Sequence, residues 1–202
     1  MPESPQEFHA RVVAEVADKG YRDADWSHWM TWPFDGELSV RPLAAPSLPE
    51  PPRAGEGDRP CDTCVPTVAP IWQDELFRIG LGHQPTGLPF AAWLMPHEHG
   101  DLDDLDDAAA ARMGVLLVHL DRAIRTVLDV GRVQIARWGD GGSHLHLYVY
   151  ARPAGLLQLR GTFLSHWDDL LPPVPPEIRD ADAALVAAEL VRTAGGTMAA
   201  PG

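Results

Sequence analysis

The sequence predicts an α+β fold, in which an antiparallel sheet is flanked by one long helix and carries helical additions at both ends. Three patterns predict it. Residues 90–95 form an apolar run that suits a buried strand. Apolar side chains recur on one face of a helix over residues 107–128. Two strand candidates, 132–138 and 144–152, flank a Gly-Asp-Gly-Gly turn, so they should pair antiparallel.

Length and charge limit the classes of function. A chain of 202 residues with 45% hydrophobic content can build one complete core with extensions. A formal net charge of −13 argues against a nucleic-acid polymer as partner, whereas a small anionic ligand needs only a local site. No apolar run approaches the roughly 20 residues that span a bilayer, and the N-terminus has no export signal. We therefore expect a cytoplasmic protein with no membrane partner.

The N-terminal region predicts a helix and a connector. The helix should begin after Ser4, with Pro5 in its first turn and Glu7 completing a capping box, and should end at Gly20. Residues 41–60 contain six prolines and little periodicity, which predicts an extended connector. The predicted parts are a helical and Pro-rich N-terminal extension (1–60), a core (61–175), and a C-terminal helix with a tail (176–202).

The core should contain further elements around these strands. A short strand is expected around residues 76–79, before the apolar strand. The acidic segment 101–107 suits the positive N-terminal end of the long helix. It lacks the alternating ligands and the Gly-then-Glu ending of a calcium loop. After the second hairpin strand, a Pro-rich passage leads to a last helix over residues 178–192.

Two cysteines, Cys61 and Cys64, are separated by two residues. In a reducing compartment this spacing favours a metal or redox role over a structural disulfide. Zinc prefers tetrahedral Cys and His ligands, and the spacing lets both thiolates reach one ion. Thioredoxin-like redox pairs open a helix in a βαβ unit, and no periodic run follows Cys64 here.

The second hairpin strand alternates strictly between polar and apolar side chains. Such a strand would place His144, His146, Tyr148 and Tyr150 on one face and the intervening apolar residues on the other. One imidazole can then bind a metal while its neighbour attacks a substrate. From the spacing alone, two surface histidines beside aromatic residues explain the pattern equally well.

The segment from Cys61 to Arg152 resembles the histidine-triad superfamily, which includes the nucleotide hydrolases and transferases of that name and the galactose-1-phosphate uridylyltransferases. The motifs follow the family's order: the Cys-x-x-Cys pair, an aromatic-acidic strand at residues 72–76, a Pro-x-x-His at residues 96–99, an acidic loop, a long helix, and a His-x-His strand that ends in Arg152.

The resemblance implies a role for each histidine. His99 matches the family's histidine after the strand, and His144 matches the first histidine of the triad. In zinc-bearing members these two complete the cage with residues that match Cys61 and Cys64, and the zinc is structural. His146 matches the central histidine, which in family enzymes attacks the α-phosphorus and becomes transiently nucleotidylated.

The sequence departs from the family at two places. Tyr148 stands where the hydrolases have a third histidine and the uridylyltransferases have glutamine; a phenol can donate a hydrogen bond but supplies no cation near neutral pH. The turn at Gly142 and Ser143 is shorter than the family's glycine-containing approach to the phosphate. We expect Ser143 to offer its hydroxyl and N–H to the anion, and Gly142 and Arg152 to contact the ligand.

Two alternative assignments stay open. A register shifted by two would make His144 central and His146 last, but it would remove a zinc ligand and lose the family's spacing from Tyr148 to Arg152. His97 would be the alternative ligand if the register at His99 were shifted.

The resulting hypothesis is a nucleotide hydrolase or nucleotidyltransferase that acts on a phosphoanhydride or phosphoramidate through a covalent His146 intermediate. The alternative is a non-catalytic, zinc-stapled protein of the same fold that binds a nucleotide or another small molecule. A third possibility is a different reaction of the altered triad, because fold does not determine function. By resemblance alone, a homodimer is expected.

Overall fold

The structure is a computed structural model of the chain. It describes residues 3–21, 30–36, 39–65, 69–82 and 85–198. Two compact units are present, Met1–Pro51 and Pro52–Gly202, and each is described by itself. The division of the chain at residues 60 and 175 stays a prediction.

The N-terminal unit contains the predicted first helix, α1 (Pro5–Lys19). Ser4 and Glu7 form the predicted capping box, and Gly20 follows the last turn with a φ of 73°. A positive φ at this position is easily adopted by glycine, which explains why the helix ends there. Residues 39–50 contain neither helix nor strand.

The second unit is built on a six-stranded antiparallel sheet with the order β4-β5-β3-β2-β1-β6 among the described residues. The strands are β1 (Trp72–Gln73), β2 (Phe77–Leu81), β3 (Phe90–Pro96), β4 (Val130–Ala136), β5 (Leu147–Pro153) and β6 (Thr197–Met198). The structure confirms the predicted α+β class and the antiparallel pairing of β4 with β5.

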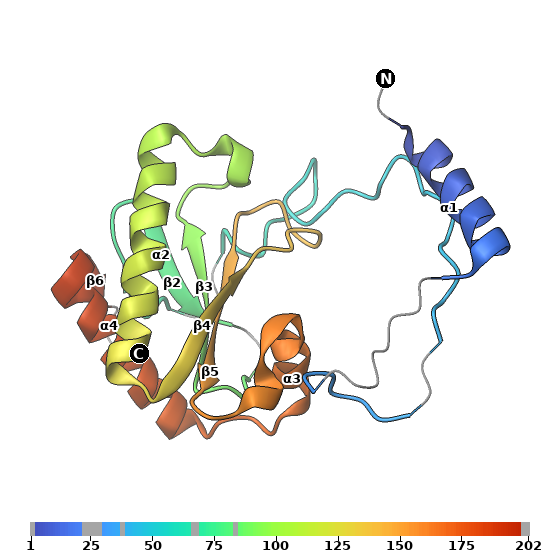
Figure 1. The fold of residues 1–202 in the computed structure, drawn as a ribbon. Helices are drawn as coiled ribbons and strands as arrows, with labels where there is room; N and C mark the ends of the chain where they lie inside the picture. Colours follow the sequence, from blue (N-terminus) through green and yellow to red (C-terminus); the bar gives the residue numbers. More distant parts are fainter. Residues whose placement is uncertain (1–2, 22–29, 37–38, 66–68, 83–84, 199–202) are drawn as a thin grey trace. The chain divides into compact units, whose positions relative to one another are not determined.

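Two long helices cover one face of this sheet, as Figure 1 shows for α2 (Asp107–Val127) and α4 (Pro176–Ala194). Asp106 caps α2 by accepting a hydrogen bond from the N–H of Ala109, and the apolar stripe of α2 is buried. The bounds of α2 agree with the prediction within one residue. In the described residues, no helix combines the length and apolar character needed to cross a membrane.

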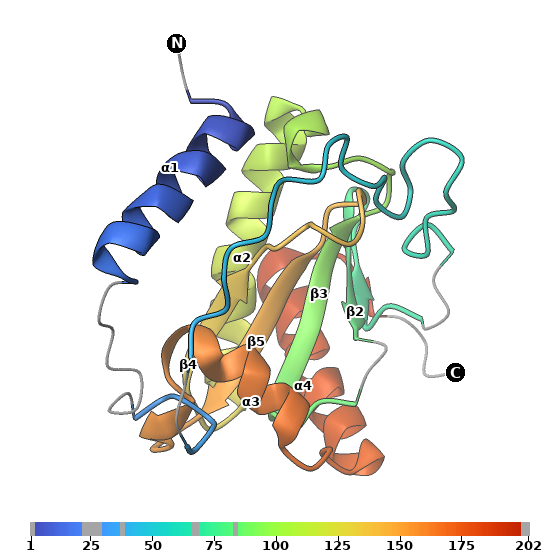
Figure 2. The ribbon, with the colours of Figure 1, turned by 90° about the vertical axis from the view of Figure 1, so that its right-hand side faces the viewer.

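The core lies between the two helices and the sheet. Leu147, Val149 and Ala151 of β5 are buried on this side, while Tyr148 and Tyr150 face the other side, as the alternation predicts. A smaller apolar cluster on that other side joins Leu88 and Leu159 to Leu164 of α3 (Leu164–Leu170), and Tyr150 packs against it. Figure 2 shows α3 in front of β5, with α2 and α4 behind the sheet.

The second hairpin strand begins later than predicted. β5 starts at Leu147, so His144 and His146 lie in the segment that leads into it. The reason is that this segment pairs with loops: the N–H of Ser143 donates to the carbonyl of Ala54 and the N–H of Leu145 to that of Gly100. The side chains nevertheless alternate, with Leu145 in the core.

Candidate metal centre and adjoining pocket

Four side chains from three separate segments converge at the end of the sheet where β3 ends and β5 begins. Cys61 and Cys64 come from the turn before β1, His99 from the loop after β3, and His144 from the segment before β5. One ligand atom from each of the four lies within 4.8 Å of all the others. The structure therefore brings together the four residues that the sequence predicts as metal ligands.

The orientation of His144 suits a metal ligand. Its side chain is buried, and its Nε2 lies 3.0 Å from the carbonyl oxygen of Pro96, which can only accept a hydrogen bond. Nδ1 is thus left with the lone pair, and it points to Sγ of Cys61 and of Cys64 at 3.6 and 3.4 Å. Burial lowers the pKa of His144, although the hydrogen bond to Pro96 opposes this, so the neutral ligand form is favoured.

The donor set fits zinc. A tetrahedral zinc ion with bonds of about 2.1 Å to nitrogen and 2.3 Å to sulfur separates N and S ligands by about 3.6 Å. The N–S separations that involve His144 and His99 are 3.4 to 3.6 Å. Burial and the neighbouring Cys61 raise the pKa of the Cys64 thiol, so a divalent cation would favour the thiolates that are otherwise costly. His97 lies outside the cluster, with its Nε2 at 2.9 Å from the carbonyl of Asp74.

A buried arginine supports the cysteine turn, and sequence reasoning missed it. Arg78 of β2 is 7% exposed and its Nη2 donates to the carbonyl of Thr63, between the two cysteines. Its positive charge partly offsets the rise in the pKa of Cys64 that burial and Cys61 cause. Its contact with the turn is formed across 15 residues of the chain, and the sequence pattern gives no sign of it.

His146 lies beside the cluster in a pocket of about 310 Å³. Its Nδ1 is 2.7 Å from the carbonyl oxygen of His144. Because a carbonyl oxygen cannot donate, Nδ1 carries the proton, and the lone pair of a neutral ring is on Nε2. The ring also contacts Trp93 and Tyr148, with centroid distances of 5.7 and 5.3 Å.

Tyr148 stands beside His146 on the same face of the sheet. Burial raises the pKa of its phenol above the ordinary value of about 10, so the side chain is neutral at physiological pH. Its ring makes edge contacts with Trp93 and Trp138 at 5.6 and 4.8 Å. This position can donate a hydrogen bond but cannot act as a cationic acid.

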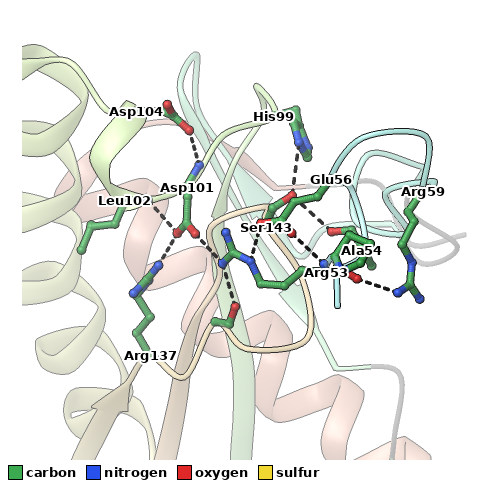
Figure 3. A network of polar contacts seen from close by, with 12 residues as sticks. Arg53, Ala54, Glu56, Arg59, His99, Asp101, Leu102, Asp104, Arg137 and Ser143 are labelled. Carbon is green, nitrogen blue, oxygen red and sulfur yellow. Dashed lines mark hydrogen bonds and ion pairs between the residues drawn. The ribbon is translucent and has the colours of Figure 1, made fainter. Parts of the chain in front are cut away.

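The donors of Ser143 are used within the chain, contrary to the prediction that they face the ligand. Both its N–H and its hydroxyl donate to the carbonyl of Ala54, at 2.9 and 3.2 Å, and the hydroxyl lies 3.5 Å from Nε2 of His99 (Figure 3). The reason is that residues 53–60 fold against the turn before β5 instead of extending away. Gly142 lines the pocket.

Arg152 is not brought to the pocket. It lies six residues beyond His146, at the far end of β5, which corresponds to about 20 Å along a strand. Its buried guanidinium donates to the carbonyls of Pro153 and Leu156, both at 3.1 Å. It therefore holds the chain that leaves the strand.

Arg53 ties residues 53–60 to the rest of the site, as Figure 3 shows. Its Nη1 lies 2.7 Å from a carboxylate oxygen of Asp101 and 2.9 Å from the carbonyl of Gly139, and its Nε binds Glu56 at 2.7 Å. Arg137 binds the other oxygen of Asp101. Burial alone would raise the pKa of Asp101, but these two guanidinium groups outweigh it and lower the pKa to about 2. The network could not be predicted because its members are far apart in the sequence.

No family model and no curated protein matches the sequence. Among solved structures, a histidine triad protein from Sinorhizobium meliloti is similar with a TM-score of 0.50 and 18% identity, over 61% of this chain and 90% of that one. A zinc-bound histidine triad family protein from Mycobacterium smegmatis gives 0.49 and 22% identity, over 65% and 94%. A uridylyltransferase gives 0.43 and 18%, over 61% of this chain and 41% of that one. Over the matched 61% of its length, the chain has the fold of the histidine-triad proteins.

Proposed function

We propose that the chain is a zinc-stabilised hydrolase or nucleotidyltransferase that opens a phosphoanhydride or phosphoramidate bond with His146 as the nucleophile. The hydrogen bond of 2.7 Å between Nδ1 of His146 and the carbonyl of His144 carries this proposal. It holds the ring in the tautomer whose Nε2 has a lone pair, which is what covalent catalysis by histidine requires.

The reaction would have two steps. In the first, Nε2 of His146 forms a bond to the phosphorus, and the bond from phosphorus to the leaving group breaks, with its electron pair going to the leaving atom. In the second, an oxygen of water or of another acceptor attacks the phosphorus and loses its proton to the medium, which breaks the N–P bond and frees His146. The leaving atom takes a proton from the medium, because burial raises the pKa of the Tyr148 phenol and makes it a poor acid.

The pocket offers other groups to a bound phosphate. The phenol of Tyr148 can donate a hydrogen bond to a phosphate oxygen. The carbonyl of Ala54 accepts from both donors of Ser143, and Gly141 and Gly142 are two further turn residues that line the pocket. Their backbone N–H groups are suited to an anion because they carry no side chain that would block it.

Cys61, Cys64, His99 and His144 would hold the zinc. When bound, it joins the cysteine turn, the loop after β3 and the start of β5; with all four positions taken by protein side chains, its role is structural. A nucleotide or a nucleotide-like phosphate is the proposed ligand. The homodimer and the cytoplasmic location stay predictions.

A non-catalytic binding protein is the second candidate. Two observations favour it: a phenol replaces the third histidine of the triad, and Ala54 already uses the donors of Ser143. Such a protein would keep the pocket and the metal cluster and lose the group that protonates a poor leaving group.

Intact-mass measurement separates the two candidates. The full chain is purified, its zinc content is measured by elemental analysis, and its mass is recorded after incubation with nucleoside phosphoramidates and sugar nucleotides. We expect one zinc per chain and a nucleotidyl adduct that His146→Ala loses. His166→Ala, which changes an exposed histidine outside the pocket, is the matched control and should retain the adduct. Zinc without adduct or turnover would support the binding protein, and a chain without zinc would refute the metal site.

A further inference from the structure

We infer that the pocket beside His146 binds a compound with a flat aromatic ring and a single phosphoryl group, and that it rejects polyphosphates. The ring would stack on Trp93, Tyr148 and Trp138, which we call the aromatic wall. This inference rests on the proposed function and narrows it: a phosphoanhydride of a nucleotide carries at least two phosphoryl groups, so the substrate on which His146 would act is the phosphoramidate.

Tyr148 is the centre of the aromatic wall. Trp93 approaches it from β3 with a centroid distance of 5.6 Å, and Trp138 from the segment after β4 with a distance of 4.8 Å. His146 lies 5.3 Å from the same ring. All four side chains line one pocket, so a ring on the wall would lie beside the nucleophile.

The side chain of Trp138 packs edge-on against Tyr148 and lies 6.5 Å from the ring of Tyr150, yet much of its surface is left uncovered. It is 48% exposed, and the main apolar core lies on the opposite face of the sheet. A large aromatic side chain that remains exposed inside a pocket is typical of ligand-binding surfaces, where a ring of the ligand covers it. Stacking on it would remove apolar surface of both partners from water.

The wall is supported from one side. Tyr150 stacks on Tyr148 with an interplanar angle of 12° and a centroid distance of 5.9 Å. Tyr150 itself packs against the smaller apolar cluster, which includes Leu88 and Leu164. A wall that is held in place before binding costs little ordering entropy when the ligand arrives.

The charges at the pocket limit the phosphate content of the ligand. The described residues that line it include Asp62 and Asp140 but no lysine or arginine. Arg53 and Arg137, which belong to neighbouring segments, are both paired with Asp101. Two thiolates would balance the charge of a zinc ion, so the cage adds no net positive charge. Each further phosphate would thus be repelled by the two aspartates and by a chain of net charge −13.

Calorimetric titration of the zinc-bearing full chain at low ionic strength tests the inference. The ring-bearing probes are AMP, UMP and phenyl phosphate, the ring-free probes are ribose 5-phosphate and inorganic phosphate, and ATP is the polyphosphate. We expect at least one ring-bearing monophosphate to bind about 10-fold more tightly than both ring-free probes, which is the lower range of one stacked base. ATP should bind about 10-fold more weakly than AMP, a difference of roughly 1.4 kcal/mol.

Variants of the wall sharpen the test. Trp138→Ala should lower the affinity for the preferred ring-bearing probe by about 10-fold and leave the affinity for ribose 5-phosphate unchanged. Trp138→Phe should retain most of the affinity for the ring-bearing probe. Phe8→Ala removes an aromatic ring of similar exposure from the N-terminal unit and is the matched control. The inference is wrong if no ring-bearing probe exceeds the ring-free ones, if Trp138→Ala has no effect, or if ATP binds as tightly as AMP.

The result is separable from the proposed function. Ring-dependent binding without any adduct on His146 would uphold this inference and refute the nucleophile. Adducts that form equally well with ring-bearing and ring-free phosphoryl donors would do the reverse.

Discussion

The carbonyl oxygen of His144 accepts a hydrogen bond from Nδ1 of His146 at 2.7 Å. The imidazole of His144 at the same time points Nδ1 to the two cysteines. One residue therefore serves two sites: its side chain faces the metal cluster, and its backbone orients the ring beside the pocket. Any change that displaces His144 should also disturb His146.

Metal removal should lower both the thermal stability of the chain and the affinity of the pocket beside His146 for its ligand. A chelator or Cys64→Ser should reduce the Tm by at least about 5 °C, because the cluster joins segments that are up to 83 residues apart. Thermal unfolding with and without chelator measures this. The variant should no longer respond to the chelator, and an equal response in both proteins would contradict a metal site at Cys64.

Separate substitution of the two histidines should give different metal contents. His144→Ala removes a ligand and should lose the zinc, whereas His146→Ala should retain one zinc per chain, since its ring lies outside the cluster of four. Elemental analysis of the dialysed variants decides between the two registers. Retention of the zinc by His144→Ala would support the shifted register, in which His144 is the central histidine and holds no metal.

Gly55 should tolerate no side chain. Its φ is +89°, and an added Cβ would lie 2.7 Å from both Cε1 of His99 and Oγ of Ser143. Gly55→Ala should destabilise the fold by about 1–3 kcal/mol in denaturant unfolding, and lower the metal affinity as well. The control is Gly57→Ala, which has a φ of +57° but no neighbour within 4 Å, and which should cost only about 1 kcal/mol. Equal losses in the two variants would show that contact with His99 is unimportant.

The ion pair between Asp74 and Arg112 should make stability depend on pH. Burial by itself would raise the pKa of Asp74, but hydrogen bonds from the N–H groups of Phe77 and Leu76 and from Arg112, at 2.7 to 2.9 Å, outweigh it and lower the pKa. A carboxyl group whose pKa is lowered by folding makes its full contribution to the stability of the fold above its unfolded pKa of about 4. That contribution is lost as the pH falls through the lower pKa of the folded state.

Asp74→Asn should therefore have a lower free energy of unfolding than the parent chain at pH 7. Between pH 5 and pH 2 it should lose less further stability than the parent, and the difference should correspond to the titration of about one carboxyl group. Denaturant unfolding at several pH values measures both. Asp129→Asn, at an exposed position, should leave the profile unchanged. A profile of Asp74→Asn that parallels the parent would mean that other groups determine the acid limb.

Local signals determined several features of this protein from its sequence. The caps of α1 at Ser4 and Gly20 and the start of α2 at Asp107 follow from hydrogen bonding within one helical turn. The alternation after His144 correctly separates core from polar side chains, since neighbours on a strand face opposite sides. The four residues of the metal cluster could be named because their chemistry and spacing match a known motif.

Only the tertiary structure decided which distant segments are hydrogen-bonded around the site. Ala54 uses the donors of Ser143 across 89 residues, and Arg53 reaches Asp101 across 48 and Gly139 across 86. Residues 53–60 have no periodicity that would reveal these contacts. The late start of β5 and the hydrogen bond from Arg78 to the cysteine turn depend on the same kind of contact. Long-range hydrogen bonds depend on where the folded chain brings its segments together, and local spacing carries no record of that.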